Sequence, residues 1–384
     1  MLSLTALPPR RRYKNRNAAR SRPRTRRSLP GGGMRTLSVI FDGTDQCSPH
    51  EVATLRVAAS RVAALLALDY DPSHALPGAS DGSYCIPMST LTRREADALG
   101  IRGESQLWGG VVPHAFVATK LVSHRPWRSD APLPRGWKDL DGIERLTLPG
   151  CCVFSADDAW AAGTRLLRDG EVRLKQPFAR GGNGQATVHD PPALARWLED
   201  ATDAALAGGL VLERNLVKST TYSIGSSSLP GHEIAYCGRQ RTVMDRAGRE
   251  VYGGSTLTVF RGPFAVLAGK GPAEAVNVAL AYDALVRGTY GVLASRRNYD
   301  VIDGVDSRGN RHVGVLEQSW RFGGASMAEV IAFEWLARHP EASSVVAETR
   351  ESYDDAPLPE GAIAYGDGEA DSPRKYARIV PHGR

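Results

Sequence analysis

The sequence predicts a mixed α/β (α+β) protein, and three observations support this fold class. The apolar run TLSVIF at 36–41 is followed by a turn and, at 51–68, by apolar residues at helical spacing, the usual opening of an α/β domain. Two strand-like runs at 232–262 flank the turn DRAG and predict an antiparallel hairpin. Of the 384 residues, 42% are hydrophobic and 23% are charged, a globular composition with length for about two or three domains.

The net charge of +6 comes from the start of the chain. Residues 1–33 hold ten Lys or Arg and no acid, whereas the rest carries 38 basic and 42 acidic residues. A basic arm could contact nucleic acid or an anionic surface, and an acid-free, arginine-rich start is also typical of a transit peptide. We favour a third interpretation, that Met34 is the true start, because the strand RTLSVIF begins just after it.

Cysteine usage and hydropathy favour a soluble cytoplasmic protein. The five cysteines are an odd number without a CxxC pair, which argues against a disulfide framework or a structural zinc site. No uncharged apolar run approaches the ~18 residues of a membrane-spanning helix. We therefore expect no membrane contact, and nucleic acid contact only through the basic tail; a homo-oligomer remains possible.

The first half of the chain predicts two α/β units. Residues 34–118 open with the strand and the helix, whose core stripe is Leu55, Ala58, Ala59, Val62, Leu65 and Leu66. A proline-rich connection at 119–145 follows. In 146–216, a helix begins at Ser155 with a capping-box-like Asp158, a strand ends near Lys175, a glycine-rich loop occupies 178–185, and a helix at 191–209 leads to the strand 210–216.

The second half predicts an antiparallel sheet with two helices. Strands at 219–262 precede a helix at 272–288, and a hairpin around the turn DSRGN at 306–310 follows. Ser326 and Glu329 form a capping box for a helix at 326–339. The polar, Pro/Gly-rich residues 351–384 predict a loose tail.

Two groups of residues have the chemistry of a phosphate and metal site. Lys175 precedes Gly181, Gly182 and Gly184, and glycines let backbone N–H groups approach phosphate oxygens; a solvated hairpin is the plainer interpretation. Asp300 or Asp303 should lie near Glu317 on a paired strand, an arrangement that suits Mg²⁺, with Arg321 near a transferring phosphoryl group. The plainer interpretation here is a salt-bridged hairpin.

The order of these motifs resembles the ATP-grasp superfamily. The segments are VRLKQPFARGGNGQ, GLVLERNL and VLEQSWRFGGAS, of which the last, at 315–326, closely matches the superfamily's ExNxR(x)GG strand. More narrowly, the chain resembles an uncharacterised bacterial family within that superfamily. The resemblance covers about 105–350, and implies two α+β subdomains that grip ATP, a lid at 146–216 and a core at 217–350, preceded by a small Rossmann-like domain.

The resemblance also implies roles for individual residues. Lys120 and Lys175 would bind the ATP phosphates, and the three glycines would close over them. Glu213, Arg214 and Leu216 would lie at the adenine hinge. Magnesium, or manganese, would be held by Asp300 or Asp303 with Glu317, and Arg321 would contact the phosphoryl group. Two departures stand out: Ser319 replaces an expected asparagine ligand, and 218–223 offers no acid for the ribose.

The activity that the resemblance implies is ligation. An ATP-dependent ligase would convert a small carboxylate into an acyl-phosphate for attack by an amine or other nucleophile. On this view Lys175→Ala should leave the melting temperature of the ligand-free protein nearly unchanged. The alternatives are a nucleotide-binding protein with a decayed site and, more remotely, a serine hydrolase that uses Ser80 of the string GASDG.

Overall fold

The computed structural model describes residues 35–41, 49–72, 82–178, 184–354, 356–366 and 373–381. The predictions for the basic segment 1–33, Ser80, Gly181 and Gly182 lie outside these residues. Within the described ranges, no helix is long and apolar enough to cross a membrane. The four cysteines described are all buried and free.

The N-terminal unit begins with a strand–helix–strand motif. Strand β1 (Thr36–Ile40) and strand β2 (Ser83–Pro87) pair in parallel, and α1 (Pro49–Leu66) lies between them in the chain. The apolar stripe predicted on α1 is confirmed, because its residues Leu55, Ala58, Ala59 and Val62 are buried. A second sheet has the order β12–β4–β3, from β3 (Leu91–Thr92), β4 (Gly110–Val112) and the distant β12 (Leu293–Ala294); α2 (Arg93–Ala98) follows β3.

Short turns of 3-10 helix lie on both sides of β4. η1 (Glu104–Gln106) precedes this strand, and η2 (Ala115–Ala118), η3 (Lys120–Ser123) and η4 (Ile143–Arg145) lie in the segment that leads to the next unit. Although this segment is rich in proline, much of it is buried, and Phe116, Leu121 and Ile143 belong to a hydrophobic core. The buried η3 fixes the position of Lys120.

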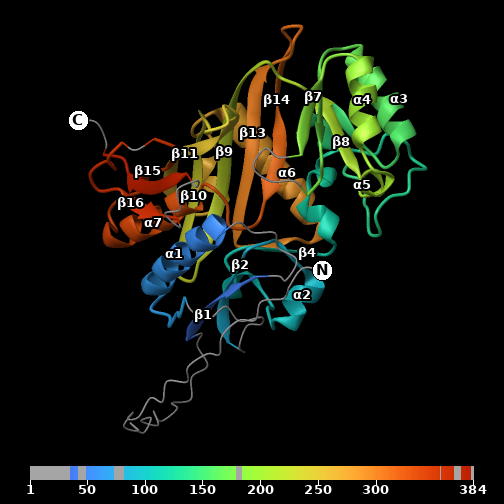
Figure 1. Cartoon of the computed structure of the whole chain (residues 1–384). Helices are drawn as coiled ribbons and strands as arrows, with labels where there is room; N and C mark the ends of the chain where they lie inside the picture. Colours follow the sequence, from blue (N-terminus) through green and yellow to red (C-terminus); the bar gives the residue numbers. More distant parts are fainter. Residues whose placement is uncertain are drawn as a thin grey trace, which may run out of the picture. The chain divides into compact units, whose positions relative to one another are not determined.

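A four-stranded antiparallel sheet forms the predicted lid, with its elements grouped together in Figure 1. Its order is β5–β8–β6–β7, from β5 (Gly150–Val153), β6 (Val172–Lys175), β7 (Gln185–Val188) and β8 (Leu210–Arg214). Helix α3 (Ala156–Leu167) begins after Ser155 as predicted. The single helix predicted at 191–209 is wrong: α4 (Pro191–Asp200) ends, and the Thr202 hydroxyl accepts a bond from the Ala205 N–H and begins α5 (Asp203–Ala207).

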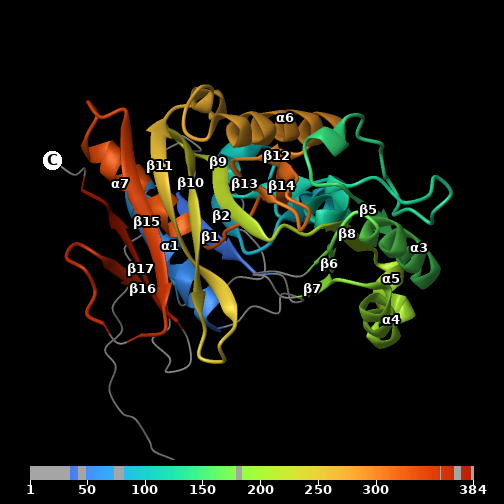
Figure 2. The same ribbon diagram turned by 90° about the horizontal axis from the view of Figure 1, so that it is seen from above.

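An eight-stranded sheet forms the core, with the order β14–β13–β9–β10–β11–β15–β17–β16. Its strands are β9 (Lys218–Leu229), β10 (His232–Met244), β11 (Glu250–Arg261), β13 (Arg296–Val305), β14 (Arg311–Ser319), β15 (Ser344–Ser352), β16 (Ile363–Tyr365) and β17 (Arg374–Ile379). Helix α6 (Ala273–Tyr290), preceded by η5 (Phe264–Leu267), packs along β13 and β14 (Figure 2). Helix α7 (Ser326–Arg338) packs on β15 and β17 and contacts α1.

The C-terminal segment differs from the loose tail that its composition predicts. Strand β17 pairs with both β15 and β16, and so extends the core sheet. Tyr365 and Ala377 are buried in the same hydrophobic cluster as α1 and α7. Although prolines and glycines dominate the connections, alternate apolar residues on these short strands supply a buried face.

The predicted capping box at the start of α7 is also wrong. The Ser326 hydroxyl accepts a bond from the Gly323 N–H, outside the helix. Glu329 is fully buried and forms an ion pair with Arg296 of β13. The Ser-x-x-Glu pattern is present in the sequence, but tertiary pairing with a buried arginine takes the place of the local cap.

Candidate active site

The hairpin of β13 and β14 brings two acidic residues face to face. Asp300 lies opposite Glu317, whereas the next residue, Val301, lies opposite Val315. Leu316 is therefore an extra residue, a β-bulge, and bulges of this kind re-aim neighbouring groups at the edges of sheets and beside active sites. Asp300 also contacts the Asn298 side-chain amide: Nδ2 of Asn298 donates to Oδ1 of Asp300 over 2.8 Å.

Asp303, the alternative to Asp300, does not join this pair. It is three residues from Asp300 on the same strand, and an odd offset places the two side chains on opposite faces of the sheet. Both oxygens of Asp303 accept bonds of 2.9 Å from Arg311, which also reaches Glu274 of α6. The acid that faces Glu317 is Asp300.

The two facing carboxylates affect one another electrostatically. Burial raises the pKa of Asp300, and the nearby Glu317 raises it further, to about 6. Lys120 lies on the other side of Glu317, with its Nζ 3.0 Å from Oε2. The Lys120 side chain is 7% exposed and that of Glu317 is 35% exposed, so the lysine approaches the pair from the protein interior.

A second cluster occupies the lid sheet. Lys175 at the end of β6 forms an ion pair with Glu213 of β8, and both side chains are buried. His124, which follows η3, places Nε2 3.2 Å from the other oxygen of Glu213. Burial raises the pKa of Glu213, but Lys175 and then His124 outweigh burial and hold that pKa below its ordinary value.

The two clusters meet at the bulge in β14. Lys175 Nζ lies 3.4 Å from the carbonyl oxygen of Leu316, while Lys120 pairs with the next residue, Glu317. The segment before β5 also lies close to β14 here: a Cβ on Gly314 would lie 2.7 Å from the carbonyl carbon of Thr147. Two lysines from different segments of the chain thus reach neighbouring residues of one strand.

Other residues predicted for the site lie around these clusters or apart from them. Gly184 has a φ of +63° and closes the base of the glycine-rich loop, where its carbonyl accepts a 2.9 Å bond from the Gln176 N–H. Leu216 packs with Leu148, Ile302 and Leu316. The Arg214 side chain donates to the Leu166 and Glu171 carbonyls, so it supports the α3–β6 turn instead of joining Glu213.

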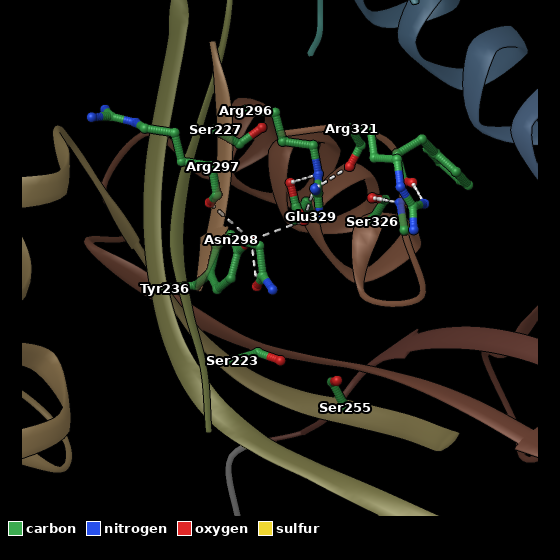
Figure 3. A network of polar contacts seen from close by, with 12 residues as sticks. Ser223, Ser227, Tyr236, Ser255, Arg296, Arg297, Asn298, Arg321, Ser326 and Glu329 are labelled. Carbon is green, nitrogen blue, oxygen red and sulfur yellow. Dashed lines mark hydrogen bonds and ion pairs between the residues drawn. The ribbon is translucent and has the colours of Figure 1, made fainter. Parts of the chain in front are cut away.

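Ser319 is the last residue of β14, two positions after Glu317, and Arg321 follows the strand. Arg321 donates through Nη1 to the Phe322 carbonyl, and its own carbonyl accepts a bond from Arg296 (Figure 3). Ser319 lies opposite Asn298 in the strand register. Asn298 and Arg296 are not among the predicted site residues, and Glu329 was predicted only as a cap of α7, because only the strand register shows which side chains face one another.

The chemistry of the donors fits a magnesium ion. Asp300 and Glu317 provide hard carboxylate oxygens on adjacent strands, and Mg²⁺ binds through one or two carboxylates together with substrate phosphates. In the part of the chain that the structure describes, no group of three or more His, Cys, Asp or Glu side chains could hold a metal ion.

Comparison with known proteins gives one family match for this chain. A family model described as "Protein of unknown function (DUF3182)" matches residues 39–380. No curated protein matches the sequence. Nearly all of the N-terminal unit, the lid and the core therefore fall within one family match.

Solved structures with a similar fold are ATP-grasp enzymes. Pyruvate carboxylase from Rhizobium etli is 10% identical with a TM-score of 0.50, over 91% of this chain and 36% of that chain. D-alanine–D-alanine ligase from Bacillus anthracis is 14% identical with a TM-score of 0.45, over 80% of this chain and 100% of that chain. The biotin carboxylase domain of Hydrogenobacter thermophilus 2-oxoglutarate carboxylase is 16% identical with a TM-score of 0.40, over 62% and 59%.

The likeness concerns the fold alone, because the sequence identities are low. The match spans 59% of the Hydrogenobacter domain and 36% of the pyruvate carboxylase chain. The mixed α/β fold predicted from the sequence is confirmed, and it resembles the fold of ATP-grasp proteins.

Proposed function

This chain belongs to the DUF3182 family, and we propose that it is an ATP- and magnesium-dependent ligase that joins a small carboxylate to an amine or another nucleophile. The observation that carries the proposal is the convergence at the bulge of β14. Two buried lysines, Lys120 and Lys175, reach neighbouring residues there, beside the facing carboxylates of Asp300 and Glu317. Cations next to paired acids can bind the phosphates and the metal of a nucleotide together.

The lysines would bind phosphate by exchanging partners. Each is held by a carboxylate in the ligand-free protein, Lys120 by Glu317 and Lys175 by Glu213. Asp300 and Glu317 would hold magnesium, which neutralises phosphate charge when bound. Once Glu317 turns to the metal, Lys120 would move from this carboxylate to a phosphate oxygen. The glycine-rich loop that ends at Gly184 would close over the phosphates, and Arg321 would contact the transferring group.

The proposed reaction has two steps. A carboxylate oxygen of the substrate attacks the γ-phosphorus, an O–P bond forms, and the bond to the ADP oxygen breaks to give an acyl-phosphate and ADP. The nucleophile then attacks the acyl carbon, loses a proton and releases inorganic phosphate. The protein contributes position and charge neutralisation, and the closed loop excludes water from the acyl-phosphate.

A second candidate is a protein that binds the nucleotide without ligation. Ser319 favours it, because a serine hydroxyl is a poorer magnesium ligand than the amide that the ATP-grasp motif places there. The two candidates differ in turnover and agree on nucleotide binding.

Phosphate release separates the two candidates. The full chain would be incubated with MgATP and pools of small carboxylic acids and amines, and inorganic phosphate would be measured. A ligase releases phosphate with at least one acid–amine pool, Arg321→Ala loses this release, and the matched variant Arg308→Ala, at an exposed turn arginine, keeps it. Nucleotide binding without phosphate release in any pool would support the second candidate.

A further inference from the structure

A buried ion pair lies next to the facing carboxylates. Arg296 of β13 and Glu329 of α7 are 1% and 0% exposed, and three bonds of 2.6–3.1 Å join the guanidinium to the carboxylate (Figure 3). Burying two charges costs solvation free energy that their mutual attraction barely offsets. A buried ion pair therefore adds little net stability to the folded protein. Its value to the protein lies in what it holds in place.

The ion pair leads to Asp300 through two polar side chains. The Tyr236 hydroxyl lies 3.1 Å from Glu329 Oε1 and 3.2 Å from Asn298 Oδ1, and Asn298 Nδ2 donates to Asp300 over 2.8 Å. Tyr236 is fully buried. The chain of contacts therefore runs from a fixed ion pair to one of the two facing carboxylates.

These contacts fix the orientation of the Asn298 amide. Its NH₂ group must face the Asp300 carboxylate, which only accepts, and its oxygen then faces the Tyr236 hydroxyl, whose single proton is shared among this oxygen, Glu329 Oε1 and the Arg297 carbonyl. A flipped amide would place its oxygen against a carboxylate oxygen. Asn298 of β13 also lies opposite Ser319 of β14. The Asn298 amide and the Ser319 hydroxyl thus form the cross-strand pair two positions along from Asp300 and Glu317.

The same ion pair reaches the loop that follows β14. Arg296 Nη1 donates to the carbonyl of Arg321, beyond its bonds to Glu329. One buried arginine thus holds the backbone of the residue proposed to contact phosphate, while its partner Glu329 holds Tyr236. Both ends of the proposed metal and phosphate site are tied to a single buried pair.

We propose that Asn298 and Tyr236 are positioning residues of the proposed metal site, which orient Asp300 toward a divalent cation through the Arg296–Glu329 pair. This inference rests on the proposed function. Neither residue needs to touch the metal: Asn298 holds Oδ1 of Asp300, and Gln240 also hydrogen-bonds this carboxylate, so both amides help to set its direction. Residues that orient metal ligands typically change metal affinity by about tenfold or more when removed.

The test compares metal affinity with nucleotide affinity in the full chain. Wild type, Asn298→Ala and Tyr236→Phe would be titrated with Mn²⁺ in the presence of a non-hydrolysable ATP analogue, with free Mn²⁺ measured by electron paramagnetic resonance. Analogue affinity in EDTA would be measured separately. We expect both variants to bind Mn²⁺ about tenfold or more weakly and to bind the analogue in EDTA as wild type does.

Tyr290→Phe is the matched control. Tyr290 is also a buried tyrosine, and its hydroxyl bonds only to the Lys138 backbone among the contacts described. Losing this hydroxyl should lower the melting temperature to a similar degree without a change in Mn²⁺ affinity. If Asn298→Ala does not fold, Tyr236→Phe still tests the positioning role. This variant should fold, because Glu329 keeps Arg296 as a partner and no buried charge is left unpaired.

The outcomes distinguish this inference from the proposed function. Wild-type Mn²⁺ affinity in Tyr236→Phe overturns the positioning role and leaves the proposed function intact. A wild-type protein that binds neither Mn²⁺ nor the analogue overturns both. A loss of analogue affinity in EDTA equal to the loss of Mn²⁺ affinity would mean that the variants distort the whole site, and it also overturns the inference.

Discussion

Lys175 is a buried residue whose charge is balanced by one carboxylate. Glu213 is fully buried and has Lys175 and His124 as partners. Removing a single partner of a buried ion pair leaves an uncompensated charge in the interior, which destabilises by about 3–5 kcal/mol. The structure therefore changes the expectation, drawn from the sequence, that Lys175→Ala leaves the ligand-free protein nearly unaffected.

Lys175→Ala should lower the free energy of unfolding of the ligand-free protein by about 3–5 kcal/mol. Urea unfolding followed by circular dichroism measures this value. The double variant Lys175→Met/Glu213→Gln should regain most of the loss, because no unpaired charge remains, yet gain no protection from ATP. A Lys175→Ala protein as stable as wild type would show that Glu213 does not depend on the lysine.

Residue types were easier to predict than residue partners. Lys120, Lys175, Glu213 and Glu317 stand out in the sequence because their order matches a known set of motifs. The pairing of Lys175 with Glu213 instead of solvent, and the choice between Asp300 and Asp303, depend on strand register. A register shifted by one residue reverses the face of every side chain, and no sequence pattern fixes the bulge at Leu316.

At the scale of elements, the β13–β14 hairpin determines the geometry of the site. Asp306 holds its turn: one oxygen accepts 2.9 Å bonds from the Arg308 and Asn310 N–H groups, and the other lies 3.2 Å from His312 Nε2. Burial raises the pKa of Asp306, but bonds from Asn310 and then His312 outweigh it, and the pKa lies well below its ordinary value.

The hairpin turn should give the protein an acid-sensitive contribution to stability. Because the folded-state pKa of Asp306 is depressed, the stabilisation is complete above its ordinary pKa of about 4 and is lost as the pH falls further. Asp306→Asn should reduce the free energy of unfolding at pH 7 by about 2 kcal/mol. Denaturant unfolding at several pH values would show the gap from wild type closing below about pH 4; a gap independent of pH contradicts the assignment.

Elements with a strong local pattern were predicted well, and those that depend on tertiary contacts were not. The turns at 245–248 and 306–310 and the start of α3 have clear local signals, and the structure confirms them. The break between α4 and α5 and the pairing of β17 were not predicted. Thr202 competes as a new N-cap, and β17 gains its stability from neighbouring strands that are distant in the sequence.

At the scale of the whole molecule, the lid sheet and the core sheet meet along β14. Leu148, which precedes β5, and Leu216, which follows β8, pack with Ile302 and Leu316 of the hairpin. The Val315 N–H donates to the Leu146 carbonyl over 2.8 Å. The segments of both sheets were predicted from the sequence, but their contact depends on the close packing of Thr147 against Gly314, which has no side chain.

Thermal unfolding with ATP tests the central claim, a magnesium–nucleotide site at the bulge of β14, most directly. The full chain and Glu317→Gln would be melted with and without ATP, in Mg²⁺ and in EDTA. The account predicts that ATP with Mg²⁺ stabilises the wild type, by about 2.7 kcal/mol at a hundred times the dissociation constant, and that Glu317→Gln loses the dependence on Mg²⁺. A folded wild type whose melting temperature is the same in all four conditions would contradict it.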